Sequence, residues 1–201
     1  MKLIIAFMVA TVFLQLSACA RTQVPATVMY TLTIPTFKPG SVAAESSDNI
    51  LSIDVPRSMA AIMSRNILYQ ENQHDLNAYA YSRWSDTPNR MIANLLLARL
   101  RESGLFKVVV PVDSRAKSNY VLESVIHQFH QQVASTDRSR VQVHMSFYLL
   151  EKNTAKVVAS NELRASKLTP SVDASGGVSA FNEAVTDISQ QVEVWLRTLK
   201  L

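Results

Sequence analysis

The residue best suited to covalent chemistry is Cys19, the only cysteine among 201 residues. It ends the stretch LSAC at residues 16–19, in which two small residues precede the thiol. Ahead of it lie the positively charged Lys2 and an almost unbroken apolar run over residues 3–14. A charged tip, an apolar run of about 7–15 residues and a small-residue exit are typical of a secretory signal peptide. A transmembrane helix needs about 20 apolar residues, so this pattern predicts an export signal.

The residues before the thiol indicate how this signal is processed. Leu16, Ser17 and Ala18 followed by Cys19 resemble a bacterial lipobox. In that class a peptidase cleaves before the cysteine, whose sulfur carries a diacylglycerol and whose new amine receives an N-acyl chain. The resemblance implies a firm membrane anchor, because several acyl chains bind a bilayer far more tightly than one. The residue after the cysteine is Ala20 and not aspartate. By resemblance to enterobacterial lipoproteins, this implies that the protein is transported to the outer membrane.

Three other groups of residues are incomplete as chemical sites. His127 and His130 suggest a metal pair, but an odd spacing in a strand places side chains on opposite faces, and zinc requires three or four ligands. Serine, histidine and aspartate occur without the G-x-S-x-G elbow of a hydrolase. Gly176-Gly177 has no nearby lysine, so it is a weak match to a phosphate-binding loop. We therefore expect no metal, no catalytic residue and no cofactor beyond the covalent lipid on Cys19.

The charge of the chain is weakly basic. It has 20 lysines and arginines against 16 acidic residues, a net charge of +4. These charges are scattered rather than gathered into a basic block, which favours a solvated surface over a nucleic-acid-binding face. Once Cys19 is acylated, no cysteine is left for a disulfide. The expected partners therefore exclude nucleic acid.

Strand and helix patterns alternate through the first half of the exported chain. Thr87-Pro88 provides an N-cap residue and a first-turn proline for a helix that Gly104 ends. Trp84 lies just before this helix, and Tyr79 and Tyr81 lie close to it. Such aromatic residues more often pack at the edge of a core than form an exposed binding patch. Strands are expected at residues 30–34, 51–55, 66–70, 76–84 and 106–111, with a helical turn at 59–63.

The second half has the clearest periodicity. A strand is expected at residues 119–131, followed by a hairpin whose strands cover 140–149 and 155–165. An apolar stripe at three- and four-residue spacing predicts a helix over 178–199. The fold class is therefore α+β, a mostly antiparallel sheet with two main helices packed on one face. The expected organisation is a signal peptide at 1–18, a lipidated tether at 19–28 and a single domain at 29–201.

Polar residues alternate with the apolar ones in the first hairpin strand. Arg140, Gln142 and His144 share the face opposite Val141 and Val143. In an antiparallel sheet one face can pack on the core while the other meets water or a partner. The three polar residues are therefore a candidate partner-binding surface, although an exposed edge strand is an alternative.

Several short motifs occur in order along the chain. They are the lipobox, Tyr30-Thr31-Leu32, Ile53-Asp54-Val55-Pro56, Trp84 before Pro88, Ser103-Gly104-Leu105-Phe106, and Asn119-Tyr120-Val121-Leu122 with Phe129 downstream. Together they resemble the ABC-type transport auxiliary lipoproteins, of the PqiC/YmbA type that partners MCE lipid-transport systems. The order of the motifs carries the resemblance, which covers nearly the whole exported chain. The segment after Pro56 departs from the family pattern.

The resemblance implies a non-catalytic subunit. It would be anchored at the periplasmic face of the outer membrane, dock on an MCE-domain protein and assist intermembrane lipid transport, with a homo-oligomer as a possible assembly. An alternative is a lipoprotein that assists outer-membrane assembly or envelope scaffolding, whose sign would be a β-barrel partner. An anchored hydrolase is a third hypothesis, and the absence of a clustered catalytic motif argues against it.

Overall fold

The computed structural model describes residues 25–35 and 47–199. Leu16, Ser17, Ala18 and Cys19 lie outside these residues, as does nearly all of the expected signal peptide and tether, so those interpretations stay predictions. No helix within the described ranges is both long enough and apolar enough to cross a membrane.

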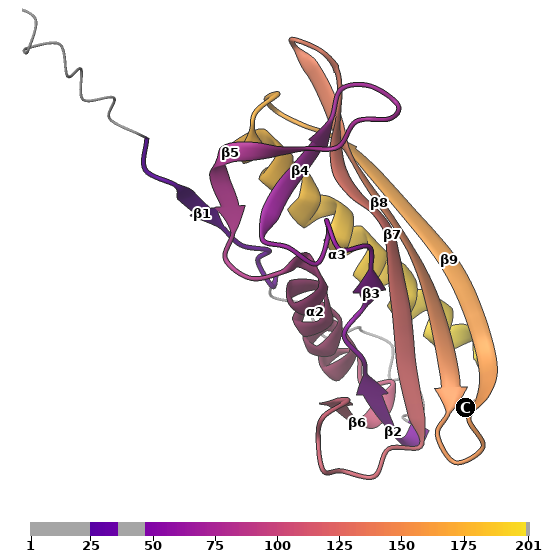
Figure 1. The fold of residues 1–201 in the computed structure, drawn as a ribbon. Coiled ribbons are helices and arrows are strands. Elements are labelled where there is room, and N and C mark those ends of the chain that lie inside the picture. The colour runs from indigo at the N-terminus through magenta and orange to yellow at the C-terminus, as the bar shows by residue number, and fades with distance from the viewer. Residues whose placement is uncertain (1–24, 36–46, 200–201) are drawn as a thin grey trace, which may run out of the picture.

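The elements are β1 (Val28–Tyr30), β2 (Ser47–Ile53), β3 (Arg57–Ser58), β4 (Asn66–Gln70), β5 (Asn77–Trp84), α2 (Pro88–Glu102), β6 (Phe106–Pro111), β7 (Tyr120–Ser135), β8 (Arg138–Glu151), β9 (Lys156–Leu168) and α3 (Ala174–Thr198) (Figure 1).

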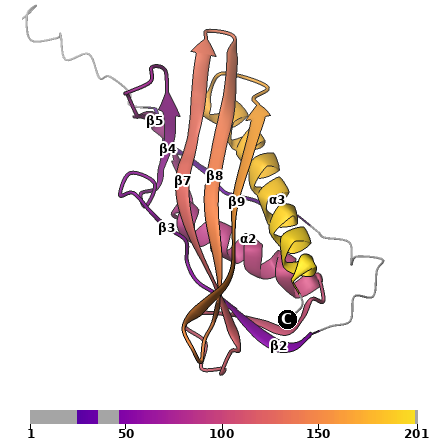
Figure 2. The same cartoon turned by 90° about the vertical axis from the view of Figure 1, so that its right-hand side faces the viewer.

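Strand β7 is the central strand of the sheet, which contains nine strands of the described chain. On one side β7 pairs antiparallel with β8, and β8 pairs antiparallel with β9. On the other side β2, β3 and β4 pair with it in parallel at successive positions along its length. Strand β6 extends the sheet from β2, while β5 and then β1 extend it from β4. The sheet therefore has two halves (Figure 2). We call β7, β8 and β9 the hairpin half, and we call β1 to β6, which lie on the other side of β7 in successive steps, the stepped half.

Both helices cover one face of this sheet, as Figures 1 and 2 show. Helix α3 packs on β8 and β9, and α2 packs on β6, β2 and α3. Trp84, Phe129 and Phe181 meet between the stepped half and α3, with ring centroids 4.3–6.0 Å apart. Arg99 of α2 and Glu193 of α3 form an ion pair at 2.5 Å, which fixes how the two helices meet. These contacts confirm the α+β fold with two helices on one face.

The helix boundaries follow the capping signals. Helix α2 begins at Pro88 and ends before Gly104, whose φ of 65° suits a residue without a Cβ. Helix α3 begins at Ala174, four residues before the expected start. Asp173 explains this, because its carboxylate accepts a hydrogen bond from Gly176 N at 2.8 Å and caps the helix.

Three strand expectations are wrong in detail. The strand expected at 51–55 covers Ser47–Ile53 instead, and Val55 lies beyond its end, 44% exposed. A strand was expected at 30–34, but β1 covers Val28–Tyr30. The chain then leaves the sheet, because Leu32 turns into the core and Thr33 N bonds Asn182 Oδ1 of α3 at 2.6 Å. Within β9, Val157 does not join the buried face and is 57% exposed. A register shift between Leu149 and Leu150 precedes the hairpin turn and disrupts the alternation there.

Candidate functional site

Arg140, Gln142 and His144 all lie on the outer face of β8, the face turned away from α3 and the core. Their neighbours Val141, Val143 and Met145 are buried on the opposite face, as alternation requires. Arg140 is exposed, while Gln142 and His144 are half-buried by flanking side chains. The structure thus places the three predicted residues on one surface; their role in partner binding stays a prediction.

Neighbouring strands add charged and ring side chains to this surface. His144 Nε2 lies 2.6 Å from Glu162 Oε1 of β9, and Arg164 Nη2 donates to the same oxygen at 2.5 Å. The ring of His127, on β7, lies 4.7 Å from the ring of His144. We call Arg140, Gln142, His144, His127, Ser146, Glu162 and Arg164 the outer-face cluster. Sequence reasoning missed its members on β7 and β9, since only strand register brings them beside β8.

The outer-face cluster is electrostatically organised. The hydrogen bond from His144 holds the pKa of Glu162 below its ordinary value, and the charge of Arg164 acts in the same direction. The carboxylate is therefore ionised at neutral pH and ties two basic side chains together. An arrangement with cations and an anion at fixed spacing suits recognition of a polar protein surface, where such charges set orientation and specificity.

A serine–histidine contact within the cluster resembles part of a hydrolase site. His127 Nε2 and Ser146 Oγ lie 2.8 Å apart. A triad also needs a carboxylate that orients the histidine. Glu162, the carboxylate of this cluster, bonds His144 instead. The geometry therefore supplies two of the three required roles and gives no support to the anchored-hydrolase hypothesis.

The two histidines considered as a metal pair are placed differently from the expectation. Both lie on the outer face, because a register shift between Ile126 and Gln128 changes the alternation of β7. His127 contacts Ser146, whereas His130 pairs with Gln142 and is only 9% exposed. Burial lowers the pKa of His130. In the described ranges, no three histidine, cysteine or acidic side chains are grouped so that they could hold a metal ion.

Gly176 and Gly177 lie inside the first turn of α3 rather than before it. A Cβ on Gly177 would lie 2.3 Å from the side-chain oxygen of Gln131, and one on Gly176 would lie 2.2 Å from the Ser171 carbonyl oxygen. The glycines therefore permit close packing. The carboxylate of Asp173 already occupies the helix N-terminus, so an anionic phosphate would meet a like charge there.

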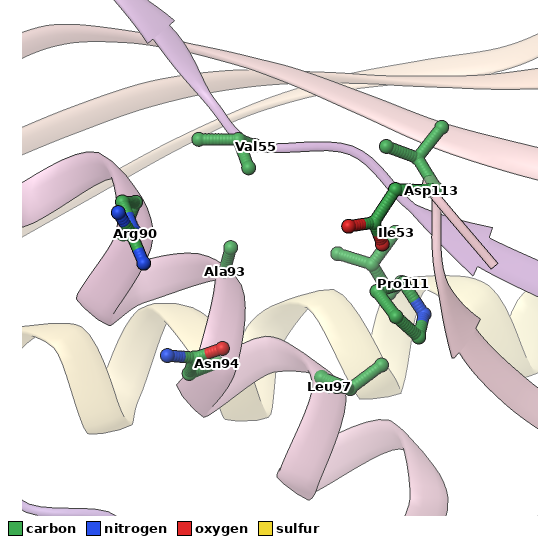
Figure 3. A pocket seen from close by; sticks show the side chains of 9 residues that line it. Ile53, Val55, Arg90, Ala93, Asn94, Leu97, Pro111 and Asp113 are labelled. Atoms are coloured by element: carbon green, nitrogen blue, oxygen red, sulfur yellow. The ribbon is translucent and has the colours of Figure 1, made fainter.

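A cleft of about 300 Å³ opens between α2 and the ends of β2 and β6 (Figure 3). Ile53, Val55 and Leu97 contribute apolar side chains to it, and Arg90 and Asp113 add charges of opposite sign. Arg90 is also paired with Asp86 at 3.1 Å. This volume is at the lower end of the range for small-molecule sites, so the cleft could take only a small group or one side chain of a partner.

A shallower groove of about 630 Å³ runs between β9 and α3. Val194, 55% exposed, and Trp195 of α3 line it together with Asn161 and Leu163 of β9. Within the described chain β9 pairs with β8 alone, so its second edge has free backbone groups. An edge strand beside an apolar groove suits strand addition by a partner, which was the alternative docking mode expected from the sequence.

Comparison with known proteins identifies relatives of this architecture. A profile of the family described as "ABC-type transport auxiliary lipoprotein component" matches residues 30–193. No curated protein matches the chain significantly. The crystal structure of a DUF330-family protein from Xanthomonas campestris is similar, with a TM-score of 0.76, 20% identity, and coverage of 84% of this chain and 94% of that one.

A second crystal structure, of an uncharacterized protein, matches with a TM-score of 0.68 and 11% identity, over 86% of this chain and 99% of that chain. At such identities the two structures establish a shared fold alone. The family profile begins at the last residue of β1 and ends within α3, so it covers β2 to β9, all of α2 and most of α3. This chain therefore belongs to the ABC-type transport auxiliary lipoprotein family.

Proposed function

We propose that this lipoprotein is a non-catalytic auxiliary subunit of an MCE-type intermembrane lipid transport system, anchored at the periplasmic face of the outer membrane. Family membership supports an auxiliary role in transport. The lipobox-like stretch at residues 16–19 supports the anchor, and Ala20 supports the outer membrane as its destination. The observation that carries the proposal is the family match over residues 30–193.

The outer-face cluster is the proposed docking surface for the MCE-domain partner. Its charges are held in place by the contacts of Glu162 with His144 and Arg164, so they are ordered before a partner arrives. Preordered groups lose less conformational entropy on binding. The hairpin half that carries them is covered on its inner face by α3, which leaves the outer face as the side open to a partner.

The anchor is tested by the mass of the mature N-terminal peptide. Wild-type protein from its own envelope should begin at Cys19 and carry one diacylglyceryl and one N-acyl group. The Cys19→Ser variant should keep its signal peptide, since the modified thiol is what the peptidase requires in this class. A mature protein that begins elsewhere, or that carries an unmodified Cys19, would contradict the anchor.

The transport role is tested by purification in a mild detergent from the native envelope, followed by mass spectrometry of associated proteins. Co-elution of an MCE-domain protein is the expected result. Co-elution of a β-barrel or lipopolysaccharide-insertion protein instead would move the function to outer-membrane assembly. Recovery without either partner after cross-linking would contradict docking at this face.

A further inference from the structure

Strands β1 and β5 present a small apolar and basic surface on the side of the sheet away from the core. Met29 pairs with Arg83, and Tyr30 pairs with Trp84. Trp84 is fully buried, so the adjacent Arg83 and its partner Met29 point to the other face. Tyr81, two residues earlier on β5, has an exposed side chain. Arg65 joins this group, because its Nη2 lies 3.8 Å from Met29 Sδ. We call Met29, Arg65, Tyr81 and Arg83 the anchor-side patch.

Two members of this patch expose large apolar side chains. Met29 is 49% exposed and Tyr81 is 47% exposed. A tyrosine at a bilayer interface sits with its ring at the level of the headgroups, and arginine extends its apolar stem while its guanidinium stays in the polar layer. The apolar side chains of a methionine and a tyrosine suit the hydrocarbon side of a phospholipid surface. The two arginines suit its anionic headgroups.

The position of the patch in the chain matches that surface. Val28, where β1 begins, follows Cys19 by nine residues. Even fully extended, such a segment spans only about 30 Å, at roughly 3.3 Å per residue. A domain on so short a tether stays close to the bilayer that holds its acyl chains, and β1 is the element that the tether enters.

We propose that the anchor-side patch rests directly on the phospholipid surface in which the acyl chains of Cys19 are embedded. This inference rests on the proposed lipid anchor and adds a second, protein-mediated membrane contact. Strand β9, at the other edge of the sheet, then faces away from the bilayer. The contact fixes the orientation of the domain, since a tether alone would let it rotate.

The single cysteine makes the contact measurable in the full lipoprotein. With Cys19 acylated, a thiol introduced by Met29→Cys or Tyr81→Cys is the only reactive one. Each variant carries an environment-sensitive fluorophore and is reconstituted into vesicles of phosphatidylethanolamine and phosphatidylglycerol that contain a nitroxide-labelled lipid. Val157→Cys and Val194→Cys are matched controls, because Val157 and Val194 are 57% and 55% exposed and lie at the far side of the fold.

The expected result is a blue shift and strong quenching at positions 29 and 81, with neither at positions 157 and 194. Equal, water-like emission at all four positions in protein that floats with the vesicles would overturn the contact while leaving the anchor intact. Protein that does not float, and that takes up label at Cys19, would overturn the anchor and the contact together.

Charge provides an independent arm of the test. Arg65→Gln should reduce the quenching at position 81, by a shift of about fivefold in the bound-to-free ratio, as expected for one cation at an anionic surface. Arg115→Gln, in the exposed loop between β6 and β7, should leave it unchanged. Raising the salt to about 1 M should weaken the contact, since the Debye length falls to about 3 Å. Quenching that responds equally to both substitutions would contradict a local contact.

Discussion

The two faces of β8 share one backbone and one register, yet their chemistry is opposite. On the inner face Val141, Met145 and Phe147 have no exposed surface. On the outer face Arg140 and Tyr148 are exposed and His144 belongs to a charged cluster. The inner face holds the sheet against α3, so its side chains are constrained by packing. In the described part of the chain the helices lie on the other face, and the outer-face side chains are held by polar contacts with one another.

Substitutions at two adjacent residues of β8 test the difference between its two faces most strongly. Phe147→Ala should lower the free energy of unfolding by about 3–5 kcal/mol, because it removes a fully buried ring and leaves a cavity. Tyr148→Ala, on the outer face, should cost less than about 1 kcal/mol. Urea unfolding followed by circular dichroism measures both. Similar losses at the two positions would contradict the division between faces.

A second substitution tests the polar end of the inner face. Gly177→Ala would bring a Cβ to 2.3 Å from Gln131 Oε1, and Gln131 is fully buried. The side chain of Gln131 is held by Tyr79 Oη at 3.0 Å and Ser139 Oγ at 2.8 Å, so it cannot move freely. We expect a loss of about 1–3 kcal/mol in thermal unfolding. Ser175→Ala, an exposed change in the same turn, is the control and should be nearly neutral.

A third substitution tests the helix that covers the inner face. Asp173→Ala should destabilise the protein by about 1 kcal/mol, because Gly176 N loses its acceptor. Asp173→Asn retains an acceptor and should cost less at neutral pH.

The pH dependence of Asp173 has a defined sign. The hydrogen bond from Gly176 N, and then that from Ser171, lower its pKa below the ordinary value of 3.8. Its charged form therefore stabilises the folded state above that value, and this contribution is lost as the pH falls below it. The unfolding midpoint of the wild type should exceed that of Asp173→Asn at pH 7, and this difference should shrink as the pH is lowered toward 3. A constant difference would contradict the role of the charge.

The smallest effect is expected on the outer face. The pKa of Glu162 is lowered from 4.5, first by the His144 hydrogen bond, so Glu162→Gln should remove a minor stabilisation present above about pH 4.5 and lost below it. Exposed pairs contribute little to folding. The expected result is a small difference between the unfolding midpoints at pH 7 that shrinks as the pH is lowered toward 3. A loss as large as that of Phe147→Ala would show that the outer face is structural.

The sequence predicted the parts of this fold that carry strong local signals. Alternation in residues 140–149 and 155–165 predicted the hairpin of β8 and β9, and the Thr87-Pro88 and Gly104 signals predicted α2. The placement of Arg140, Gln142 and His144 on one face followed from the same alternation. These features depend on neighbours in the chain, which a single sequence contains.

Features that depend on distant segments were not predictable in this way. The pairing of β2, β3 and β4 with one side of β7 joins strands far apart in the chain. The register shift in β7 that brings His127 beside His144 has no residue signature. Glu162 and Arg164 belong to the candidate site because the register between β8 and β9 places them opposite residues of β8.

The most direct test of the central claim is quantitative co-purification of the MCE-domain protein with two charge variants. One carries Arg140→Glu, Gln142→Glu and His144→Glu on the outer face. The other carries Arg115→Glu and Lys117→Glu in the exposed loop between β6 and β7. With both variants folded and membrane-bound, the account predicts loss of the partner from the first and full recovery with the second. Full recovery with the outer-face variant would contradict docking there.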